Sequence, residues 1–339
     1  MRCAIIGLGM AVTPHAKSLV DLRGRVEVVA AYSPTAARRD AFAARFGLPV
    51  TDDLDAIVDD PSIDYAVLLT PPNARSVLVR RLAAAGKHIL MEKPVERTTG
   101  AAEEIVATAE RAGVTLGIVL QHRFREVAER LGERLASGAL GSVAAVHIVV
   151  PWWREQSYYD EPGRGTRARD GGGVLISQAI HTLDLALAFA GPVDEVVAVG
   201  GTTSLHRMES EDFAAAAIRF TGGAYGSLMA TTAFFPGAPE RIELACGRAH
   251  AVLGPGGVSI RYHDGREEDF GEPQGSGSGA DPMDFPHDAH RALHADFVDA
   301  LQNRRAPRVT GREALEVHRF IDAVVSAVRD RAAVRPAGT

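Results

Sequence analysis

The sequence has few cysteines and no long apolar run. Its 339 residues include two cysteines, Cys3 and Cys246, which are too few for a disulfide framework and favour a reducing compartment. No apolar stretch approaches the roughly 18 residues that span a bilayer. The N-terminus, MRCAIIGLGM, lacks the charged segment and apolar core of a signal peptide. We therefore expect a cytoplasmic protein.

Neither sign of charge is in large excess. Lysine and arginine number 37, and aspartate and glutamate number 43, which gives a net charge of −6. This balance gives no reason to expect nucleic acid or a membrane surface as a partner. Hydrophobic residues make up 46% of the chain, and its length suits two packed domains.

Short apolar runs alternate with helical patterns over the first 120 residues. The runs are β-branched and nearly continuous, as is typical of buried parallel strands; they cover residues 3–7, 26–32, 64–70, 88–93 and 115–120. Alternation of this kind predicts βαβ units, an α/β fold and a parallel sheet with helices on both faces. We assign residues 1–121 to a dinucleotide-binding domain.

The pattern changes after residue 121. Strand-like segments follow one another, separated by glycine turns; they cover residues 142–152, 193–201, 211–220 and 224–235, and shorter runs continue to 263. We assign residues 122–339 to a second, α+β domain with a large, mostly antiparallel open sheet. Helices are expected at about 125–137, 287–303 and 312–330. The exposed sheet face is a candidate interface for a homodimer or homotetramer, and the polar segment 271–283 is expected to be a mobile or rim loop.

The first strand leads into a glycine turn that is typical of a phosphate-binding loop. Residues 7–12 read Gly7-Leu8-Gly9-Met10-Ala11-Val12. Gly7 permits the turn, and Gly9 lets the backbone approach a pyrophosphate at the helix N-terminus. Val12 stands where a third glycine is usual, so the motif alone is also compatible with an ordinary strand–helix turn. Its position at the start of a βαβ unit favours dinucleotide binding.

The end of the second strand bears on the choice between NAD and NADP. An NAD-selective site usually has an acidic residue here to hold the ribose 2′-hydroxyl, but no acidic residue lies between Glu27 and Asp40. Ser33 and Arg38 can instead accept a 2′-phosphate, which favours NADP over NAD. The alternative is that Arg38 and Arg39 form only a solvated helix face.

Two further segments end strands of the predicted sheet, where open α/β sheets bind their ligands. Thr70-Pro71-Pro72-Asn73 follows the run 64–70, and Glu92-Lys93-Pro94 ends the run 88–93. A lysine at the mouth of the sheet can act in acid–base chemistry or donate a hydrogen bond to a substrate oxygen.

The segment GGGVLISQAIHTLD, residues 171–184, places a titratable pair on an apolar helix. If the helix begins near Val174, Ser177, His181 and Asp184 share one face, while a leucine stripe faces the core. The glycines allow a close backbone approach to a ligand. Asp184 can either orient the His181 imidazole or hold a neighbouring loop. The alternative for His181 is a hydrogen-bonded core residue.

An aromatic and basic segment precedes these glycines. Both tryptophans of the chain lie at 152–153, and the residues expected to contact a polyhydroxylated, anionic ring are Trp153, Arg154, Tyr158 and Arg164. Gln121 and Arg123, just beyond the run 115–120, are expected near the same cleft, with Gln121 toward the cofactor. The alternative is a loop packed on the sheet or at a subunit contact.

His287, His290 and His294 follow one another on a helix, but no convincing carboxylate or thiolate set accompanies them, so we assign no metal site.

Four motifs together resemble the Gfo/Idh/MocA family of glucose–fructose oxidoreductase, inositol dehydrogenase and relatives. They are GLGMA near the start, AAGKHILMEKP at 84–94, GGGVLISQAIHTLD, and FVDALQNRRAPRVTG near the end. The resemblance covers nearly the whole chain. It implies an N-terminal Rossmann domain, a C-terminal domain with a large open sheet, dimers or tetramers built on that sheet, and reversible hydride transfer between NAD(P) and a sugar, an inositol or a related ring.

The resemblance also assigns roles to single residues. It matches Lys93 and His181 to the catalytic lysine and histidine, and it places around the cofactor Gly7, Gly9, Met10, Ala11, Thr70, Pro71, Asn73, Glu92 and Lys93. Three positions depart from the pattern. Val12 replaces a glycine, Arg75 stands where a histidine is usual, and Ser177 stands where many polyol dehydrogenases have an aspartate.

Three functions remain open after this comparison. The first is hydride transfer on a sugar or polyol, in which His181 exchanges the hydroxyl proton and Lys93 donates a hydrogen bond to the same oxygen. The second is the reduction or oxidation of a non-sugar carbonyl, a dihydrodiol or an imine, which the change at Ser177 leaves open. The third is a regulator that binds NAD(P) without turnover, which the presence of both Lys93 and His181 disfavours.

Overall fold

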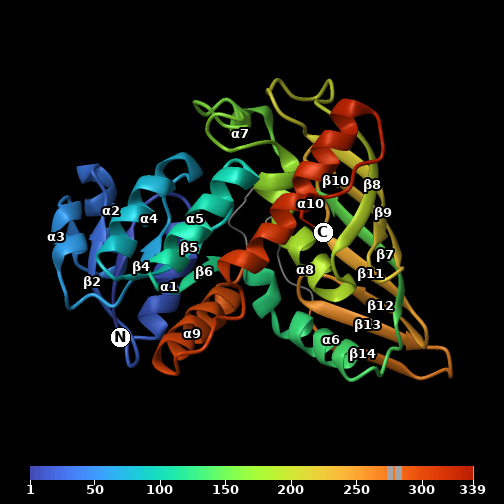
Figure 1. Ribbon diagram of the computed structural model, residues 1–339, viewed down its shortest axis with the longest axis horizontal. Coiled ribbons are helices and arrows are strands. Elements are labelled where there is room, and N and C mark those ends of the chain that lie inside the picture. Colours follow the sequence, from blue (N-terminus) through green and yellow to red (C-terminus); the bar gives the residue numbers. More distant parts are fainter. Residues whose placement is uncertain (273–277, 279–284, 339) are drawn as a thin grey trace. The chain divides into compact units, whose positions relative to one another are not determined.

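The computed structural model describes residues 1–272, 278 and 285–338 and divides into two compact units (Figure 1). The first unit comprises Met1–Gln121 and His287–Leu315, and the second comprises His122–Pro286 and Glu316–Thr339. The segment 287–315, which the sequence analysis placed in the second domain, therefore belongs to the first unit. Most of the predicted loop 271–283 lies outside the described residues.

The first unit is built on a six-stranded parallel sheet with the order β3-β2-β1-β4-β5-β6. Its strands are β1 (Arg2–Ile6), β2 (Glu27–Tyr32), β3 (Val50–Thr51), β4 (Tyr65–Leu68), β5 (His88–Glu92) and β6 (Leu116–Val119). The central strands are almost entirely buried, which explains their continuous apolar sequences. The sequence did not predict β3, because two residues are too few to show a period.

Helices flank this sheet on both faces. They are α1 (Val12–Asp21), α2 (Ala36–Phe46), α3 (Leu54–Asp59), α4 (Arg75–Ala84), α5 (Thr99–Arg111) and α9 (Asp288–Gln302), with a 3-10 turn η1 at Pro72–Ala74. The pair α1–α9 and the pair α4–α5 pack with the sheet between them (Figure 1). Gly117 of β6 admits α9, because a Cβ at Gly117 would lie 2.8 Å from the Phe297 ring.

The second unit is built on an eight-stranded sheet with the order β14-β13-β12-β11-β7-β10-β9-β8. Its strands are β7 (Val143–Pro151), β8 (Val193–Gly201), β9 (Phe213–Phe220), β10 (Tyr225–Thr231), β11 (Arg241–Cys246), β12 (Ala249–Leu253), β13 (Gly257–Tyr262) and β14 (Glu267–Gly271). All pairs are antiparallel except β7 with β10. The predicted α/β fold, with a parallel sheet followed by a mostly antiparallel one, is confirmed.

One face of this sheet is covered by helices, and the other carries exposed apolar side chains. The second unit's helical segments are α6 (Glu126–Ala136), α7 (Gln156–Tyr159), the π-helix η3 (Leu175–Ala179), α8 (Ile180–Ala190) and most of α10 (Gly311–Asp330); the 3-10 segment η2 (Gln121–Phe124) begins at the boundary. Helix α8 packs on β7 and β11, and α6 packs on β13 and β14. Val197 and Val199 of β8 remain 51% and 67% exposed. Among the described residues, no helix combines the length and apolarity needed to span a membrane.

Candidate active site

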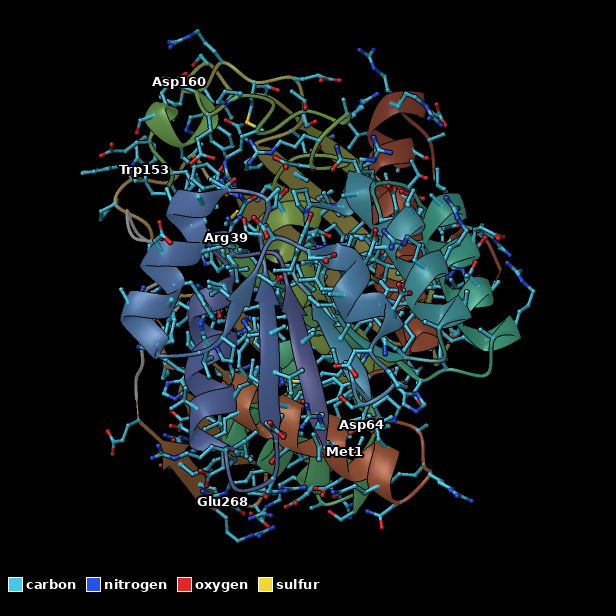
Figure 2. All side chains as sticks on the ribbon, turned by 90° about the vertical axis from the view of Figure 1, so that its left-hand side faces the viewer. Met1, Arg39, Asp64, Trp153, Asp160 and Glu268 are labelled. Atoms are coloured by element: carbon cyan, nitrogen blue, oxygen red, sulfur yellow. The ribbon has the colours of Figure 1, made fainter. Side chains whose placement is uncertain are left out.

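The predicted cofactor residues of the first unit lie at one edge of its sheet. Gly7 follows β1, Ser33 follows β2, Thr70 follows β4, and Lys93 follows β5. These four strands are neighbours in the sheet and are parallel, so their carboxyl ends share an edge. Figure 2 shows Arg39 at this end and Met1 and Asp64 at the opposite one.

The glycine turn after β1 has two glycines with different surroundings. Gly7 has a φ of +108°, and a Cβ there would lie 3.0 Å from the Leu69 carbonyl carbon and 3.1 Å from the Thr70 nitrogen. Gly7 is therefore required by its own conformation and by the loop after β4. A Cβ at Gly9 would meet nothing within 4 Å. The open approach to Gly9 suits a ligand at the N-terminus of α1, beside the half-exposed Met10 and the N-cap Ala11.

The loop after β4 presents polar groups at the same edge. The Thr70 Oγ1 atom is buried and has no hydrogen-bond partner among the described residues. A buried hydroxyl without a partner is unfavourable, so this atom fits a polar group of a bound dinucleotide. Pro71 and Asn73, which belong to the same turn, are exposed.

The two arginines near the expected ribose site differ in the contacts that they make with other protein residues. Arg39 donates to the Ser33 carbonyl at 2.7 Å and pairs with Asp52 at 3.0 Å. Arg38 is exposed, and the structure records no ion pair or hydrogen bond of its guanidinium with any described residue. Of the two arginines, Arg38 is therefore the one available to a ligand.

Arg75, which the sequence analysis noted only as a departure, holds the backbone around Lys93. Its guanidinium is 2% exposed and donates to the carbonyls of Thr70 (2.9 Å), Glu92, Pro94 and, at 3.4 Å, Lys93. Burial lowers the pKa of Arg75 to about 10, although nearby carboxylates oppose the shift. One cation thus fixes the loops after β4 and β5 to each other.

The Glu92 carboxylate faces the interior and is bonded on both oxygens. Its Oε1 lies 3.0 Å from His15 Nε2, and its Oε2 accepts the Lys93 backbone N–H at 3.0 Å. Burial alone would raise the pKa of Glu92, but the His15 hydrogen bond and the charges of His15 and Lys93 hold it below its usual value. The Lys93–Pro94 peptide is cis. The anionic Glu92 therefore anchors the backbone that carries Lys93.

In the second unit, Ser177 and His181 lie on a continuous helical segment that begins as a π-helix. Ser177 belongs to η3, and His181 lies in the first turn of α8, 8% exposed. Glu211 caps this segment: its carboxylate accepts from the backbone N–H groups of Gly173 and Leu175 at 3.3 and 3.2 Å. Burial raises the pKa of Glu211, although these N–H groups oppose the shift. Sequence reasoning missed Glu211 because it lies more than thirty residues from the helix that it caps.

The glycines before this helix serve packing more than ligand approach. A Cβ at Gly173 would lie 1.8 Å from the Glu211 carbonyl oxygen, and one at Gly172 would lie 3.1 Å from Ile176. The protein's own backbone therefore occupies the space at Gly173 that the sequence analysis expected a ligand to use. Gly172 and Gly173 nevertheless line a small pocket with Ser177.

His181 packs against a second histidine. Its ring centroid lies 5.0 Å from that of His122, at an interplanar angle of 33°. His122 Nε2 lies 2.6 Å from Arg125 Nη2, and Arg125 pairs with the buried Glu240 at 2.9 Å. The imidazole of His181 is thus backed by a buried network of charged groups.

Asp184 contacts a residue that the sequence analysis assigned to substrate. Arg123 donates to both carboxylate oxygens of Asp184, at 2.7 and 2.6 Å. Asp184 is 1% exposed. This bidentate pair ties α8 to η2, which corresponds to the second of the two roles considered for Asp184.

Two of the residues predicted to contact substrate, Tyr158 and Arg164, line the small pocket that contains Ser177. Its lining also includes Gln178. Arg164 lies 4.3 Å above the Tyr158 ring, donates to the Tyr158 hydroxyl at 3.0 Å and pairs with Glu161. The Gln178 Oε1 atom is buried without a hydrogen-bond partner among the described residues. The lining therefore includes a cation, hydroxyl groups and an amide, together with the Asp170 carboxylate.

The other predicted substrate residues do not line this pocket. Arg154 is 3% exposed and donates to the Trp153 and Ser278 carbonyls at 2.6 and 3.3 Å. Trp153 packs against His206 and Phe235. Gln121 begins η2, next to Arg123. Of the two predicted catalytic residues, Lys93 belongs to the first unit and His181 to the second.

Comparison with known proteins adds relatives across the chain. Residues 1–119 match the family model described as "Oxidoreductase family, NAD-binding Rossmann fold", and residues 128–252 match "GFO/IDH/MocA C-terminal domain". A 1-carboxy-3-chloro-3,4-dihydroxycyclo hexa-1,5-diene dehydrogenase from Comamonas testosteroni is 30% identical over 66% of this chain and 56% of its own length, so the chain aligns with little more than half of that relative. The scyllo-inositol 2-dehydrogenase (NAD(+)) of Bacillus subtilis is 26% identical over 93% of this chain and 90% of its own.

Solved structures resemble the chain over its whole length. The crystal structure of the WlbA dehydrogenase from Bordetella pertussis, in complex with NADH and UDP-GlcNAcA, matches with a TM-score of 0.83 at 25% identity and covers 99% of this chain and 98% of that one. Levoglucosan dehydrogenase in complex with NADH matches with a TM-score of 0.85 at 20% identity, with 99% of each chain covered, which concerns the fold alone.

Proposed function

Because the chain belongs to the Gfo/Idh/MocA family of oxidoreductases and carries its NAD-binding Rossmann domain, we propose that it is an NAD(P)-dependent dehydrogenase or reductase. It transfers a hydride between the nicotinamide and a CH–OH or carbonyl carbon of a sugar, an inositol or a sugar derivative. One observation carries the proposal: Gly7, Thr70 and Lys93 follow three neighbouring strands at the edge of the sheet where open α/β sheets bind ligands, and there the buried Thr70 hydroxyl has no hydrogen-bond partner among the described residues.

When bound, a nicotinamide would supply the hydride acceptor or donor, and residues of the chain would handle the proton and the developing charge. Lys93 donates a hydrogen bond to the reacting oxygen and stabilises the negative charge that develops there. His181 exchanges the hydroxyl proton. Ser177 positions substrate or water in place of a carboxylate, and Asp184 supports α8 through Arg123.

The cofactor contacts follow the strand ends. The proposed set is Gly7, Gly9, Met10, Ala11, Ser33, Arg38, Thr70, Pro71, Asn73, Glu92, Lys93 and Gln121. Within it, the exposed Arg38 and the lack of an acidic residue after β2 favour NADP over NAD. Glu92 acts mainly through the backbone of Lys93, because both its oxygens already have protein partners.

An anionic ring is the substrate class that the second unit suits best. The proposed contacts are Arg123, Trp153, Arg154, Tyr158, Arg164 and His181. Arg164 and Tyr158 lie beside Ser177 and Gln178, and the Arg164 guanidinium over the Tyr158 ring is the group that would pair with a negatively charged substituent. The WlbA dehydrogenase, which is similar to this chain, was crystallised with UDP-GlcNAcA.

A dihydrodiol substrate is the second candidate. The relative from Comamonas testosteroni is named as a dehydrogenase of a carboxylated dihydroxycyclohexadiene. Such a ring also carries a carboxyl group and adjacent hydroxyls, which the same cation and hydroxyl groups can bind. Ser177 in place of a carboxylate is compatible with this chemistry.

Assembly and location complete the proposal. The exposed side chains of β8, Val197 and Val199, belong to the sheet face through which we propose that the chain forms a homodimer or homotetramer. Both cysteines are free and buried, in keeping with a reducing, cytoplasmic compartment.

A substrate panel tests the proposed function directly. The purified full chain is incubated with NAD⁺ or NADP⁺ and with polyols, sugars, nucleotide sugars or carboxylated cis-dihydrodiols, and cofactor reduction is followed by absorbance. We expect turnover with at least one anionic ring. Tight cofactor binding without turnover on any compound, in either direction, would instead favour a non-catalytic regulator.

A further inference from the structure

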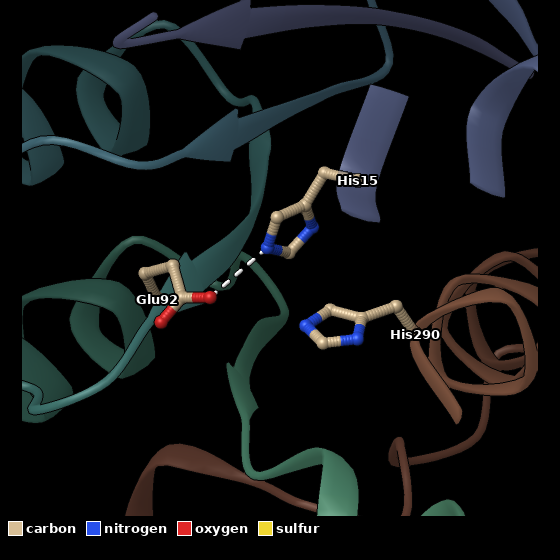
Figure 3. Close-up of side chains that lie close together, drawn as sticks. All are labelled: His15, Glu92 and His290. Carbon is tan, nitrogen blue, oxygen red and sulfur yellow. Dashed lines mark hydrogen bonds and ion pairs between the residues drawn. The ribbon is translucent and has the colours of Figure 1, made fainter. Parts of the chain in front are cut away.

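Four polar side chains meet in the interior of the first unit. His15 lies on α1, Glu92 ends β5, and His290 and His294 lie on α9. All four are buried, and the three imidazoles are at most 2% exposed. Figure 3 shows His15, Glu92 and His290 pointing toward one another from these three elements. No metal site was predicted for the α9 histidines, because the sequence does not show that Glu92 of β5 and His15 of α1 lie beside them.

Three of these side chains offer ligand atoms at a spacing that suits a metal ion. One atom each from His15, Glu92 and His290 can be chosen so that all lie within 4.8 Å of one another. A tetrahedral Zn²⁺ holds its ligand atoms about 3.3 Å apart, given bonds of about 2.0–2.1 Å. The His15 Nε2–Glu92 Oε1 distance is already 3.0 Å. Small side-chain rotations would therefore complete the set.

Neighbouring groups orient two of these side chains by hydrogen bonds, as is usual for the ligands of a metal site. His15 Nδ1 lies 2.9 Å from His294 Nε2, which fixes the ring so that Nε2 points at Glu92. The second oxygen of Glu92 accepts the Lys93 backbone N–H at 3.0 Å. Hydrogen bonds from outside to a ligating histidine and a ligating carboxylate are the outer contacts that set ligand orientation and metal affinity.

We propose that His15, Glu92 and His290 form a site for a divalent transition-metal ion, with Zn²⁺ as the best-fitting occupant. Two imidazoles and one carboxylate match the ligand preference of zinc, and a water can complete the tetrahedron. The ion would tie α1, β5 and α9 together, so its proposed role is structural. The competing account is a hydrogen-bonded polar cluster that binds no metal.

Metal titration of the tag-free, chelator-treated full chain tests the proposal. We expect one equivalent of Zn²⁺ to bind by calorimetry and to raise the melting temperature. Co²⁺ should give the visible absorption bands of a tetrahedral site. Absence of both Zn²⁺ binding and Co²⁺ bands in the wild-type chain overturns the proposal without any variant.

Four substitutions then locate the ion. His290→Ala and Glu92→Gln each remove a ligand and should weaken Zn²⁺ binding by more than about 100-fold, whereas His294→Ala removes an outer contact and should weaken it by about 10–100-fold. His287→Ala, at the N-cap of α9, pairs with Asp21 outside the cluster and should leave binding unchanged. If His290→Ala does not fold, His290→Gln replaces it. Unchanged Zn²⁺ affinity in the folded ligand variants, or equal loss in His287→Ala, places any bound ion elsewhere and contradicts the proposal.

Discussion

The carboxyl edge of the parallel sheet in the first unit and the helical segment η3–α8 in the second unit are positioned by different kinds of contact. At the edge, consecutive strands of one parallel sheet each deliver a short loop, so Gly7, Thr70 and Lys93 are brought together by the sheet itself. In the second unit, Ser177 and His181 lie on one helix that distant residues hold in place. Glu211 caps it, and Arg123 pairs with Asp184.

This difference shows which parts of a site can be predicted from sequence. A parallel sheet converts order along the chain into position in space, so strand ends can be assigned from apolar runs and glycine turns alone. A helix that depends on non-local caps and ion pairs carries no such rule. We expect substitutions at the edge to act mainly on catalysis, and substitutions around the helix to act mainly on stability.

Among the residues that only position the site, the largest effect is expected from Arg75→Ala. Removing the guanidinium frees the carbonyls of Thr70 and Glu92 that it holds, and Lys93 loses its fixed position. Misplacement by about 1 Å can lower the rate about 100-fold, so kcat should fall by that order while KM changes little. Steady-state kinetics with the best panel substrate measures this. Arg75→Lys should restore part of kcat, and a folded Arg75→Ala enzyme with normal kcat would remove Arg75 from the account.

Asp184→Asn should show the opposite signature. It breaks a bidentate pair whose carboxylate is 1% exposed and removes the negative charge that the Arg123 guanidinium meets there. The free energy of unfolding should fall by about 2–3 kcal/mol. Urea unfolding measures it. Glu243→Gln, in the exposed pair with Arg241, is the matched control and should change stability by less than about 1 kcal/mol.

Arg38→Ala tests whether the edge of the sheet also selects the cofactor. Losing one charge-assisted hydrogen bond to a 2′-phosphate should raise the Kd for NADPH about tenfold and leave the Kd for NADH nearly unchanged. Arg45→Ala, on the same helix α2, is the control. Fluorescence titration with both cofactors decides the question. A wild-type preference for NADH would contradict the assignment of Arg38 to the ribose site.

The smallest effect is expected from Glu211→Ala, which removes the cap of the helix that carries His181. Because burial of this carboxylate opposes its hydrogen bonds, the loss of stability should be about 1 kcal/mol. Thermal unfolding of this variant and of Glu209→Ala, an exposed neighbour, measures the difference. Equal melting temperatures would show that the cap does not stabilise the helix.

Much of the fold could be predicted from the sequence, and with it the positions of several candidate site residues at the strand ends. Period and glycine placement indicated both sheets, the glycine turn and the lysine after β5. The roles of Arg75, Glu211 and His15 could not be predicted, because each depends on contacts between segments that are distant in the sequence. The expectation that Gly173 leaves space for a ligand was wrong for the same reason. The backbone of Glu211 fills that space, and no local sequence pattern reveals this contact.

The central claim is that Lys93 takes part in hydride transfer, and one kinetic comparison tests it most directly. The lysines of the chain are Lys17, Lys87 and Lys93, and the exposed Lys17 supplies a matched control. Turnover and cofactor Kd are measured for the wild type, Lys93→Ala and Lys17→Ala. The account predicts that Lys93→Ala lowers kcat by about 1,000-fold with little change in cofactor Kd, and that Lys17→Ala is unchanged. Near-normal turnover in Lys93→Ala would contradict it.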